Sequence, residues 1–251
     1  MGDWYLQTGH GVRFEWGPEG AERLATGVDC VVVVDVLSFT TSVTVAVEAG
    51  TRVFPYRWRD ATAAAFAERN GADLAVGRRE AGPSSPWSLS PAALRGAPFT
   101  PRLVLPSPNG SAISASAGEA VVVAGALRNA KAVADWLARQ GYGTPERPVA
   151  VIASGERWPD GSLRPAVEDL LGAGAVVAAL QEHVGDALSP EASVVAAAFR
   201  STPDVVAAVS AGSSGRELVA YGFAQDVAVA TEVDGCAVVP VLVEGAFTAA
   251  G

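Results

Sequence analysis

Residues 30–42 read CVVVVDVLSFTTS, a β-branched apolar run that reaches Asp35 and then passes into a cluster of serine and threonine. A stretch rich in alanine and valine follows and closes at Gly50. A short apolar run bounded by turn residues is typical of a buried strand, and the stretch that closes on a glycine is typical of a helix. We therefore predict a strand over residues 30–37, a turn and a helix, which together make a βα unit.

The same alternation continues along the chain and decides the fold class. Apolar runs predict strands at 52–56, 73–77, 103–105, 120–124, 149–153 and 237–243, and helical patterns lie at 61–70, 109–117, 128–140, 164–184, 190–199, 203–210 and 213–220. Strands that alternate with helices favour a mostly parallel sheet with helices on both faces. We predict an α/β fold with Rossmann-like layering.

Two stretches rich in turn residues interrupt this alternation. Proline and serine gather between Gly82 and Pro101, and a second break runs from Gly141 to Pro148. Such stretches mark loops and domain boundaries. We predict an N-terminal α/β domain over residues 1–140 and a C-terminal α/β domain over residues 148–251, either interleaved or packed as one compact unit.

Composition narrows the classes of function. The 251 residues are 49% hydrophobic, enough for a well-buried core, and carry a net charge of −9. No basic run is long enough to follow a nucleic-acid backbone, and no apolar run reaches the length of a membrane span. The cysteines, Cys30 and Cys236, lie in apolar surroundings and are expected to be buried thiols of a reducing compartment. We expect a cytoplasmic protein without a nucleic-acid or membrane partner. The sequence leaves open whether the chain forms a homo-oligomer.

The first candidate site is the end of the predicted strand at Asp35. In open α/β sheets, ligands bind beyond the carboxyl ends of the strands. A carboxylate there is costly to bury unless it is paired or binds a cation, and the hydroxyls of Thr40 and Thr41 follow at a helix start, where the helix dipole favours an anion. The alternative is that Asp35 binds loop amides while Thr40 or Ser42 caps the helix. This segment alone supports both interpretations equally.

The second candidate site is the segment Ser107-Pro108-Asn109-Gly110-Ser111, directly after the predicted strand 103–105. Gly110 has no Cβ to keep a phosphate from the backbone, and Asn109 and Ser111 offer polar groups at a helix start. The segment is also well suited to an ordinary turn, and on its own it favours that interpretation.

The third candidate site pairs residues 154–157, which read SGER after a predicted strand, with Glu168 and Asp169 early in the next helix. Adjacent side chains on a helix point about 100° apart, so only one of the two carboxylates faces a cleft directly. Gly172 and Gly174 would let another element or a ligand come close. Oxygen ligands without nearby histidine or cysteine suit Mg²⁺. The alternative is that both acidic residues only complement the helix dipole.

Other signals are weaker. Arg216 is a candidate anion clamp, although a solvated helix arginine is the simpler interpretation. The sequence has no GxGxxG after a strand and no GxxxxGK[ST], and neither His10 nor His183 lies beside a strand-end segment. Nucleotide-binding and histidine-based chemistry are therefore disfavoured.

Taken in order, these segments resemble the 2-phosphosulfolactate phosphatase family, whose members hydrolyse a phosphate monoester with Mg²⁺. No single segment is specific, but the ordered set is. The segments that carry the resemblance are Val34-Asp35-Val36-Leu37 with Thr40-Thr41, Asn109-Gly110, Asn129-Ala130, Glu168-Asp169 with Ala173-Gly174, Gly215-Arg216-Glu217-Leu218, Asp226 and Val239-Pro240.

The chain departs from the family pattern at several positions. Ser38 stands where the family typically has arginine, and Ala153 where it tends to have cysteine. The family's Asn-Ser-Pro is Leu89-Ser90-Pro91 here, and its Thr-Thr-Asn-Gly-Thr is residues 107–111. We expect the fold to survive these changes, which bear on substrate and activity.

The resemblance implies a phosphoric monoester hydrolase for a small phosphorylated acid. Asp35 and Glu168 would be catalytic, and Mg²⁺ would be held by Asp35, Glu168 and Asp169. The phosphate ester would be bound by Thr40, Thr41, Asn109, Gly110, Ser111 and Arg216. One alternative is a catalytically silent relative that binds a phosphorylated or carboxylated metabolite. A nucleotide-binding enzyme on a Rossmann-like sheet is a second alternative, which the missing glycine fingerprint disfavours.

Overall fold

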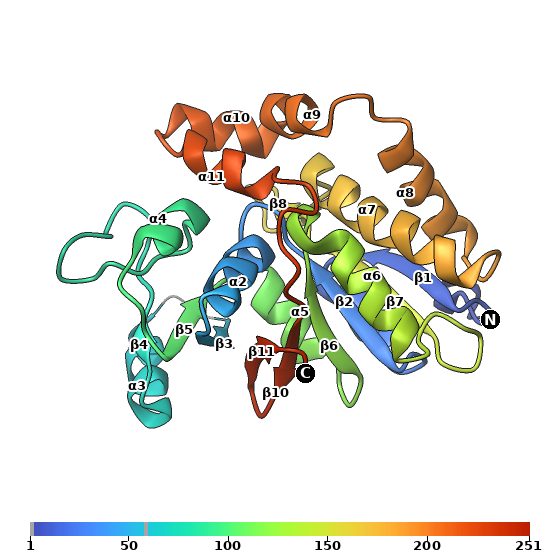
Figure 1. Ribbon diagram of the computed structural model, residues 1–251, viewed down its shortest axis with the longest axis horizontal. Helices are drawn as coiled ribbons and strands as arrows, with labels where there is room; N and C mark the ends of the chain where they lie inside the picture. The colour runs from blue at the N-terminus through green and yellow to red at the C-terminus, as the bar shows by residue number, and fades with distance from the viewer. Residues whose placement is uncertain (1–2, 58–59) are drawn as a thin grey trace.

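A computed structural model describes residues 3–57 and 60–251, and a nine-stranded sheet lies at its centre (Figure 1). The order of the strands is β1-β7-β2-β6-β10-β11-β3-β5-β4. These strands are β1 (Val12–Trp16), β2 (Cys30–Val34), β3 (Arg52–Tyr56), β4 (Asp73–Leu74), β5 (Arg102–Pro106), β6 (Val121–Gly125), β7 (Val149–Ala153), β10 (Pro240–Val243) and β11 (Ala246–Ala249). A separate two-stranded ribbon is formed by β8 (Glu156–Arg157) and β9 (Leu163–Arg164).

The sheet consists of two parallel groups joined by a hairpin. Strands β1, β7, β2 and β6 pair in parallel, and so do β3, β5 and β4. The hairpin β10–β11 lies between the groups and pairs antiparallel with both, through Val241 opposite Val123 and Phe247 opposite Val53. The predicted α/β fold with a mostly parallel sheet is confirmed.

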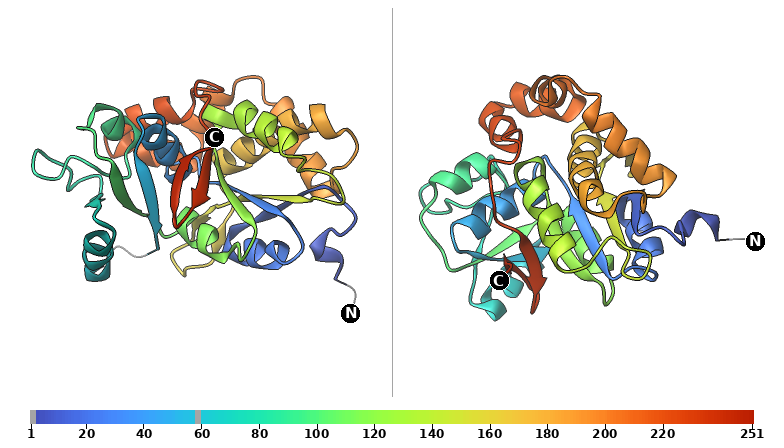
Figure 2. Two further views of the ribbon diagram at one scale, coloured as in Figure 1. Left: turned by 60° about the horizontal axis from the view of Figure 1, so that its bottom comes forward. Right: turned by 45° about the vertical axis from the view of Figure 1, so that its right-hand side comes forward.

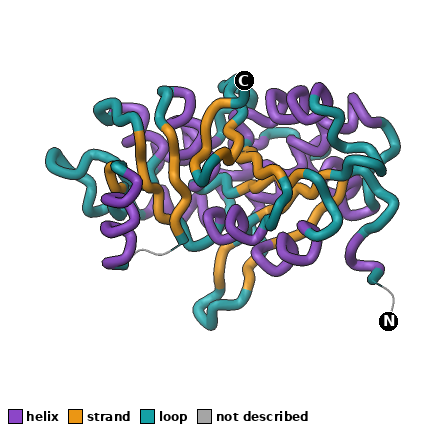
Figure 3. The backbone as a smooth tube through the Cα atoms, turned by 90° about the horizontal axis from the view of Figure 1, so that it is seen from below, coloured by secondary structure: helices purple, strands orange, loops and turns teal. Residues whose placement is uncertain are grey.

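Helices cover both faces of the sheet, as the tube view also shows (Figure 3). The helices are α1 (Gly17–Ala25), α2 (Phe39–Glu48), α3 (Ala61–Asn70), α4 (Pro91–Gly96), α5 (Gly110–Ser116), α6 (Ala130–Arg139), α7 (Val167–Val184), α8 (Pro190–Arg200), α9 (Val205–Ala211), α10 (Ser213–Ala220) and α11 (Ala224–Ala230), with the short 3₁₀ helices η1 (Trp4–Leu6) and η2 (Leu127–Asn129). Successive side chains of a strand point to opposite faces, so Cys30, Val32 and Val34 pack with α6, α7 and α8, whereas Val31 and Val33 pack with α1, α2 and α5.

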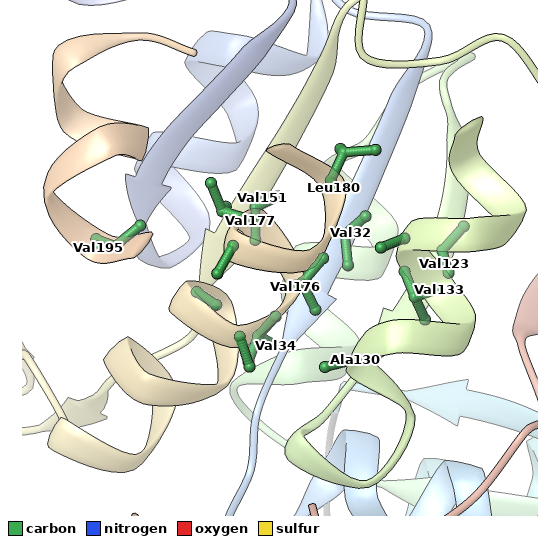
Figure 4. Packing of buried hydrophobic residues seen from close by; sticks show 14 of the residues in the cluster. Val32, Val34, Val123, Ala130, Val133, Val151, Val176, Val177, Leu180 and Val195 are labelled. Atoms are coloured by element: carbon green, nitrogen blue, oxygen red, sulfur yellow. The ribbon is translucent and has the colours of Figure 1, made fainter. Parts of the chain in front are cut away.

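Helix α7 packs unusually close to its neighbours because of two glycines. A Cβ on Gly172 would lie 2.6 Å from Val36 Cγ2, and one on Gly174 would lie 2.3 Å from the carbonyl oxygen of Val195. The close approach predicted for these glycines is therefore confirmed, toward the end of β2 and toward α8. Figure 4 shows the resulting core, in which Val176 of α7 lies near Val34 of β2. This packing brings the first turn of α7 to the end of β2.

Helices α9, α10 and α11 arch over the end of the sheet where β8 and the start of α2 lie (Figures 1 and 2). Within residues 3–57 and 60–251, no single helix has the length and apolar character to cross a membrane. Helices α8 and α9 pass such a test only as a pair, and they are bent by 101° at their break.

Strands from both sides of the predicted domain boundary pair in one sheet. Strand β7, from the predicted C-terminal domain, lies between β1 and β2, and the hairpin β10–β11 lies between β6 and β3. The division into residues 1–140 and 148–251 itself stays a prediction.

Candidate functional site

Asp35 joins the loops that follow β2 and β5. Its Oδ1 accepts a hydrogen bond from the Phe39 amide, and its Oδ2 accepts one from the Gly110 amide, both at 3.0 Å. The side chain is 7% exposed. Burial raises the pKa of Asp35 above its ordinary value, and the amides of Phe39 and Gly110 oppose that rise. Asp35 therefore lies at the predicted strand end, where it binds the first amides of two helices, α2 and α5.

Thr40 and Thr41 are buried and hydrogen-bonded within the same loop. The Thr40 hydroxyl donates to the Asp35 carbonyl at 2.8 Å and accepts from the Asp35 amide at 3.0 Å. The Thr41 hydroxyl donates to the Val36 carbonyl at 2.7 Å. Both hydroxyl protons therefore stabilise the turn in this structure and are not directed to an anion.

Asp169 ties the ends of β2 and β7 together. Its Oδ1 accepts from the Val36 amide at 2.7 Å, and its Oδ2 accepts from the Gly155 amide at 2.8 Å. Burial raises the pKa of Asp169 well above its ordinary value, and the charges of Asp35 and Glu168 raise it further. The side chain is thus a clamp on two strand ends, which needs both of its oxygen atoms.

Glu168, the neighbour of Asp169 on α7, is different. Its side chain is 2% exposed, and its Oε2 has no hydrogen-bond partner among the described residues. A buried carboxylate oxygen without a partner is costly and calls for a cation or a donor from a ligand. This arrangement agrees with the expectation that Glu168 and Asp169, as adjacent residues on a helix, point in different directions and have different roles.

Glu156 is a fourth carboxylate at this site. It lies on β8, directly beyond the end of β7, and its Oε2 is 3.4 Å from Asn109 Nδ2. Burial raises the pKa of Glu156 to about 7, and the negative charges of Asp35 and Glu168 contribute to the rise. The sequence pointed to the strand-end segment that contains Glu156, but gave no reason to select this residue.

Three buried serine hydroxyls also have no hydrogen-bond partner among the described residues. The Oγ atoms of Ser111, Ser154 and Ser214 are buried and make no hydrogen bond within the described residues. Ser111 begins α5 beside Gly110, Ser154 follows β7 beside Gly155, and Ser214 begins α10 in the arch of helices. Ser111 and Ser154 directly follow or precede Gly110 and Gly155, whose amides bind Asp35 and Asp169, so these two hydroxyls and Glu168 Oε2 are unused donors and acceptors at the site.

A sequence profile of the 2-phosphosulpholactate (2-phosphosulfolactate) phosphatase family matches residues 18–245. This chain belongs to the 2-phosphosulpholactate phosphatase family. The match spans β2, β5, β7, α7 and α11, and so includes every element that contributes to the site described above. Phosphatases are hydrolases, so the resemblance and the enzyme class predicted from the sequence are confirmed. No curated protein matches the chain.

One departure from the 2-phosphosulpholactate phosphatase pattern has a counterpart in space. The Oγ of Ser38, at the position where an arginine was expected, accepts a hydrogen bond from Arg78 Nη2 at 2.5 Å. A guanidinium thus reaches this position from the segment between β4 and α4. Ala153, the second departure, is fully buried and paired with Trp16 and Val34 in the sheet.

Gly110 has a packing role beside its predicted phosphate role. A Cβ at this position would lie 2.3 Å from Phe39 Cδ1 and 3.0 Å from Asp35 Oδ2. Its amide already donates to Asp35. The residue is glycine because α5 begins directly against the start of α2.

Arg216 lies on α10 with an exposed side chain. The geometry gives no support to the predicted role of Arg216 as an anion clamp, and that role stays a prediction.

The site offers few protein ligands for a hard cation. Within residues 3–57 and 60–251, no three His, Cys, Asp or Glu side chains are grouped so that they could hold a metal ion. Mg²⁺, however, is commonly bound by one or two protein carboxylates, with water and substrate phosphate at its remaining positions. The unpaired Oε2 of Glu168, close to the charges of Asp35 and Asp169, fits that requirement. If Mg²⁺ binds at this site, Glu168 would be the residue to hold it.

Proposed function

We propose that this chain is a Mg²⁺-dependent phosphoric monoester hydrolase for a small phosphorylated acid similar to 2-phosphosulfolactate, acting in the cytoplasm. The observation that carries the proposal is the buried, unpaired Oε2 of Glu168 among the carboxylates of Asp35, Glu156 and Asp169. Membership of the phosphatase family supports it independently.

Asp35 and Asp169 organise the site in this proposal. Each uses both carboxylate oxygens to hold backbone amides from two different segments, so the ends of β2, β5 and β7 are fixed relative to one another. Fixed loops hold ligand-binding groups in place before the substrate arrives, which lowers the cost of reaching the transition state.

Glu168 would hold Mg²⁺, and Asn109 and Ser111 would contact the phosphate. The cation, when bound, would neutralise charge on the phosphate oxygens. Asn109 is half-buried at the start of α5, and the Ser111 hydroxyl has no other partner among the described residues. Thr40, Thr41 and Gly110 would act through the loops that they stabilise.

The test is phosphate release from p-nitrophenyl phosphate and a panel of phosphorylated hydroxy acids, with Mg²⁺ and with EDTA. We expect release with Mg²⁺ and none with EDTA. Asp35→Asn leaves one of two amides without an acceptor and should lose most activity, whereas the control Asp73→Asn, at an exposed side chain, should retain it. Melting temperatures of both variants separate lost activity from lost fold.

The alternative proposal, a catalytically silent relative, predicts a different result in the same experiment. The protein would then bind inorganic phosphate or a phosphorylated acid and release no phosphate from any ester. Ala153, which stands at a position where a cysteine was expected, is the observation that keeps this alternative open.

A further inference from the structure

Arg78 acts on the charge of Asp35 and lies in a segment without regular secondary structure. Arg164, on β9, acts in the same sense on Glu156. Arg78 lies between β4 and α4, and its side chain is 18% exposed. Nε donates to Asp226 Oδ2 at 2.9 Å, and Nη2 donates to Ser38 Oγ at 2.5 Å. The guanidinium also lies over the ring of Phe223, with 5.9 Å from Cζ to the ring centroid. Ser38, directly before α2, and Asp226 on α11 therefore hold one cation between them.

Asp226 is a fixed anchor for that cation. It is fully buried on α11, and its Oδ1 accepts from the Ser90 hydroxyl and, at 3.2 Å, from the Ala92 amide. Ser90 in turn caps α4 through the Ala93 amide at 3.1 Å. Because Asp226 is held from its other oxygen, it cannot turn away, and the guanidinium keeps one orientation.

The guanidinium retains hydrogen-bonding capacity beyond these two contacts. A guanidinium has five N–H bonds, and within residues 3–57 and 60–251 the bonds to Asp226 and Ser38 use two, which leaves about three for a ligand. The charge of Arg78 reaches Asp35, where it opposes the rise in the pKa of that carboxyl. Arg78 also borders a cavity of about 310 Å³, which Arg79, Tyr221 and Phe223 line together with the carboxylates Glu80 and Glu217. Arg78 thus acts on the charge of Asp35 and also lines a cavity.

We propose that Arg78 binds an anionic group of the substrate, and that Asp226 is the positioning residue that aims it. This inference rests on the proposed function, and it adds to the proposed Mg²⁺ a fixed positive charge for a phosphorylated acid. A planar guanidinium matches the paired oxygens of a phosphate or carboxylate, which a lysine ammonium cannot do. The competing interpretation is that the Arg78–Asp226 pair only ties the arch of helices α9–α11 to the rest of the chain.

The experiment measures binding of inorganic phosphate by calorimetry, with and without Mg²⁺, and the melting temperature of each variant. Arg78→Lys retains the charge and can still reach Asp226, but it loses the fork, so we expect the phosphate Kd to rise about tenfold or more. The matched control is Arg52→Lys, whose residue pairs with the exposed Glu244. It should leave the Kd unchanged.

Two further variants keep the inference testable if Arg78→Lys does not fold. Ser38→Ala removes one contact and leaves the ion pair with Asp226, so the Kd should rise by a smaller factor at an unchanged melting temperature. Asp226→Asn, the test of positioning, should raise the Kd in the folded protein, whereas a purely structural tie would lower only the melting temperature.

Unchanged phosphate affinity in these variants would overturn the inference, as would a wild-type protein that binds no phosphate in either condition. The outcome is separable from that of the proposed function. If phosphate binds through Arg78 but no ester is hydrolysed, the role of Arg78 stands and the proposed hydrolase activity is refuted. If the wild type hydrolyses esters and Arg78→Lys has the same KM and phosphate Kd, the hydrolase activity stands and the role of Arg78 is refuted.

Discussion

Replacing Glu156 with glutamine should make the metal-free protein more stable at pH 8 and leave its stability almost unchanged at pH 5. Burial and the charges of Asp35 and Glu168 raise the pKa of Glu156 to about 7 from the ordinary value of 4.5. Between pH 4.5 and about 7, the folded protein therefore retains a proton on Glu156 that the unfolded chain has released. The contribution of Glu156 to stability is fully present below pH 4.5 and is lost as the pH rises to about 7.

The size of the effect follows from the shift. A difference of about 2.5 pKa units corresponds to about 3 kcal/mol in full, of which about 2 to 3 kcal/mol falls between pH 5 and pH 8. Glutamine resembles the protonated acid at every pH, so the variant lacks this loss. In a chain of 251 residues, the difference should raise the melting temperature by about 5 °C at pH 8.

The assay is denaturant unfolding of both proteins in EDTA at closely spaced pH values from 5 to 8. Glu244→Gln, at a side chain that is 80% exposed, is the control for the substitution itself. Wild type and Glu156→Gln should diverge as the pH rises. Parallel curves over the whole range would refute the reasoning, because they would show that Glu156 is already ionised at pH 5.

Two other substitutions test the packing and the clamp in the same unfolding assay. Gly110→Ala should lower the free energy of unfolding by about 1–3 kcal/mol, because its Cβ would lie 2.3 Å from Phe39 Cδ1 and that ring is fully buried. An unaltered stability would mean that α5 does not pack against Phe39. Asp169→Ala removes the acceptor of two buried amides and should lower the free energy of unfolding by about 2–5 kcal/mol. Glu168→Gln loses no hydrogen bond to Oε2 from the described residues, so its free energy of unfolding should change little. Equal effects would contradict the different roles assigned to the two carboxylates.

Several elements could be predicted from the sequence because their local signals agree with the tertiary structure. Strands β3 and β7 and helices α3 and α10 have the predicted bounds. Helix α3, for example, is capped by Asp60, which accepts from the Thr62 amide, and it ends at Gly71 with a φ of 55°. The first strand was predicted to reach residue 37 but ends at Val34, because Asp35 turns out of the sheet to bind two amides.

Other elements were missed because their pattern is disguised. Strand β1 contains Arg13, which is 5% exposed and donates to the carbonyls of His10 and Leu6 at 3.1 Å. A buried arginine breaks the apolar pattern that predicts a buried strand. Helices α1, α4 and α11 and strand β11 were also not predicted.

The site was predictable where a residue ends a strand and unpredictable where two distant segments meet. Asp35, Glu168 and Asp169 were selected by their position after strands or at a helix start. The hydroxyls of Thr40 and Thr41 were selected on the same grounds, but their direction depends on the turn that they close. Arg78 lies in no regular element, and its partner Asp226 is 148 residues away in the chain, so no local pattern connects them.

The most direct test of the account is the Mg²⁺ dependence of phosphate release by the wild-type protein and by Glu168→Gln, with Glu244→Gln as the matched control. The account predicts that wild type and control respond alike to Mg²⁺, and that Glu168→Gln needs at least about tenfold more Mg²⁺ for half of its own maximal rate, because a neutral amide is a weaker ligand than a carboxylate. A Glu168→Gln protein with the same Mg²⁺ response as wild type would contradict it, as would a wild-type protein that releases phosphate equally well in EDTA.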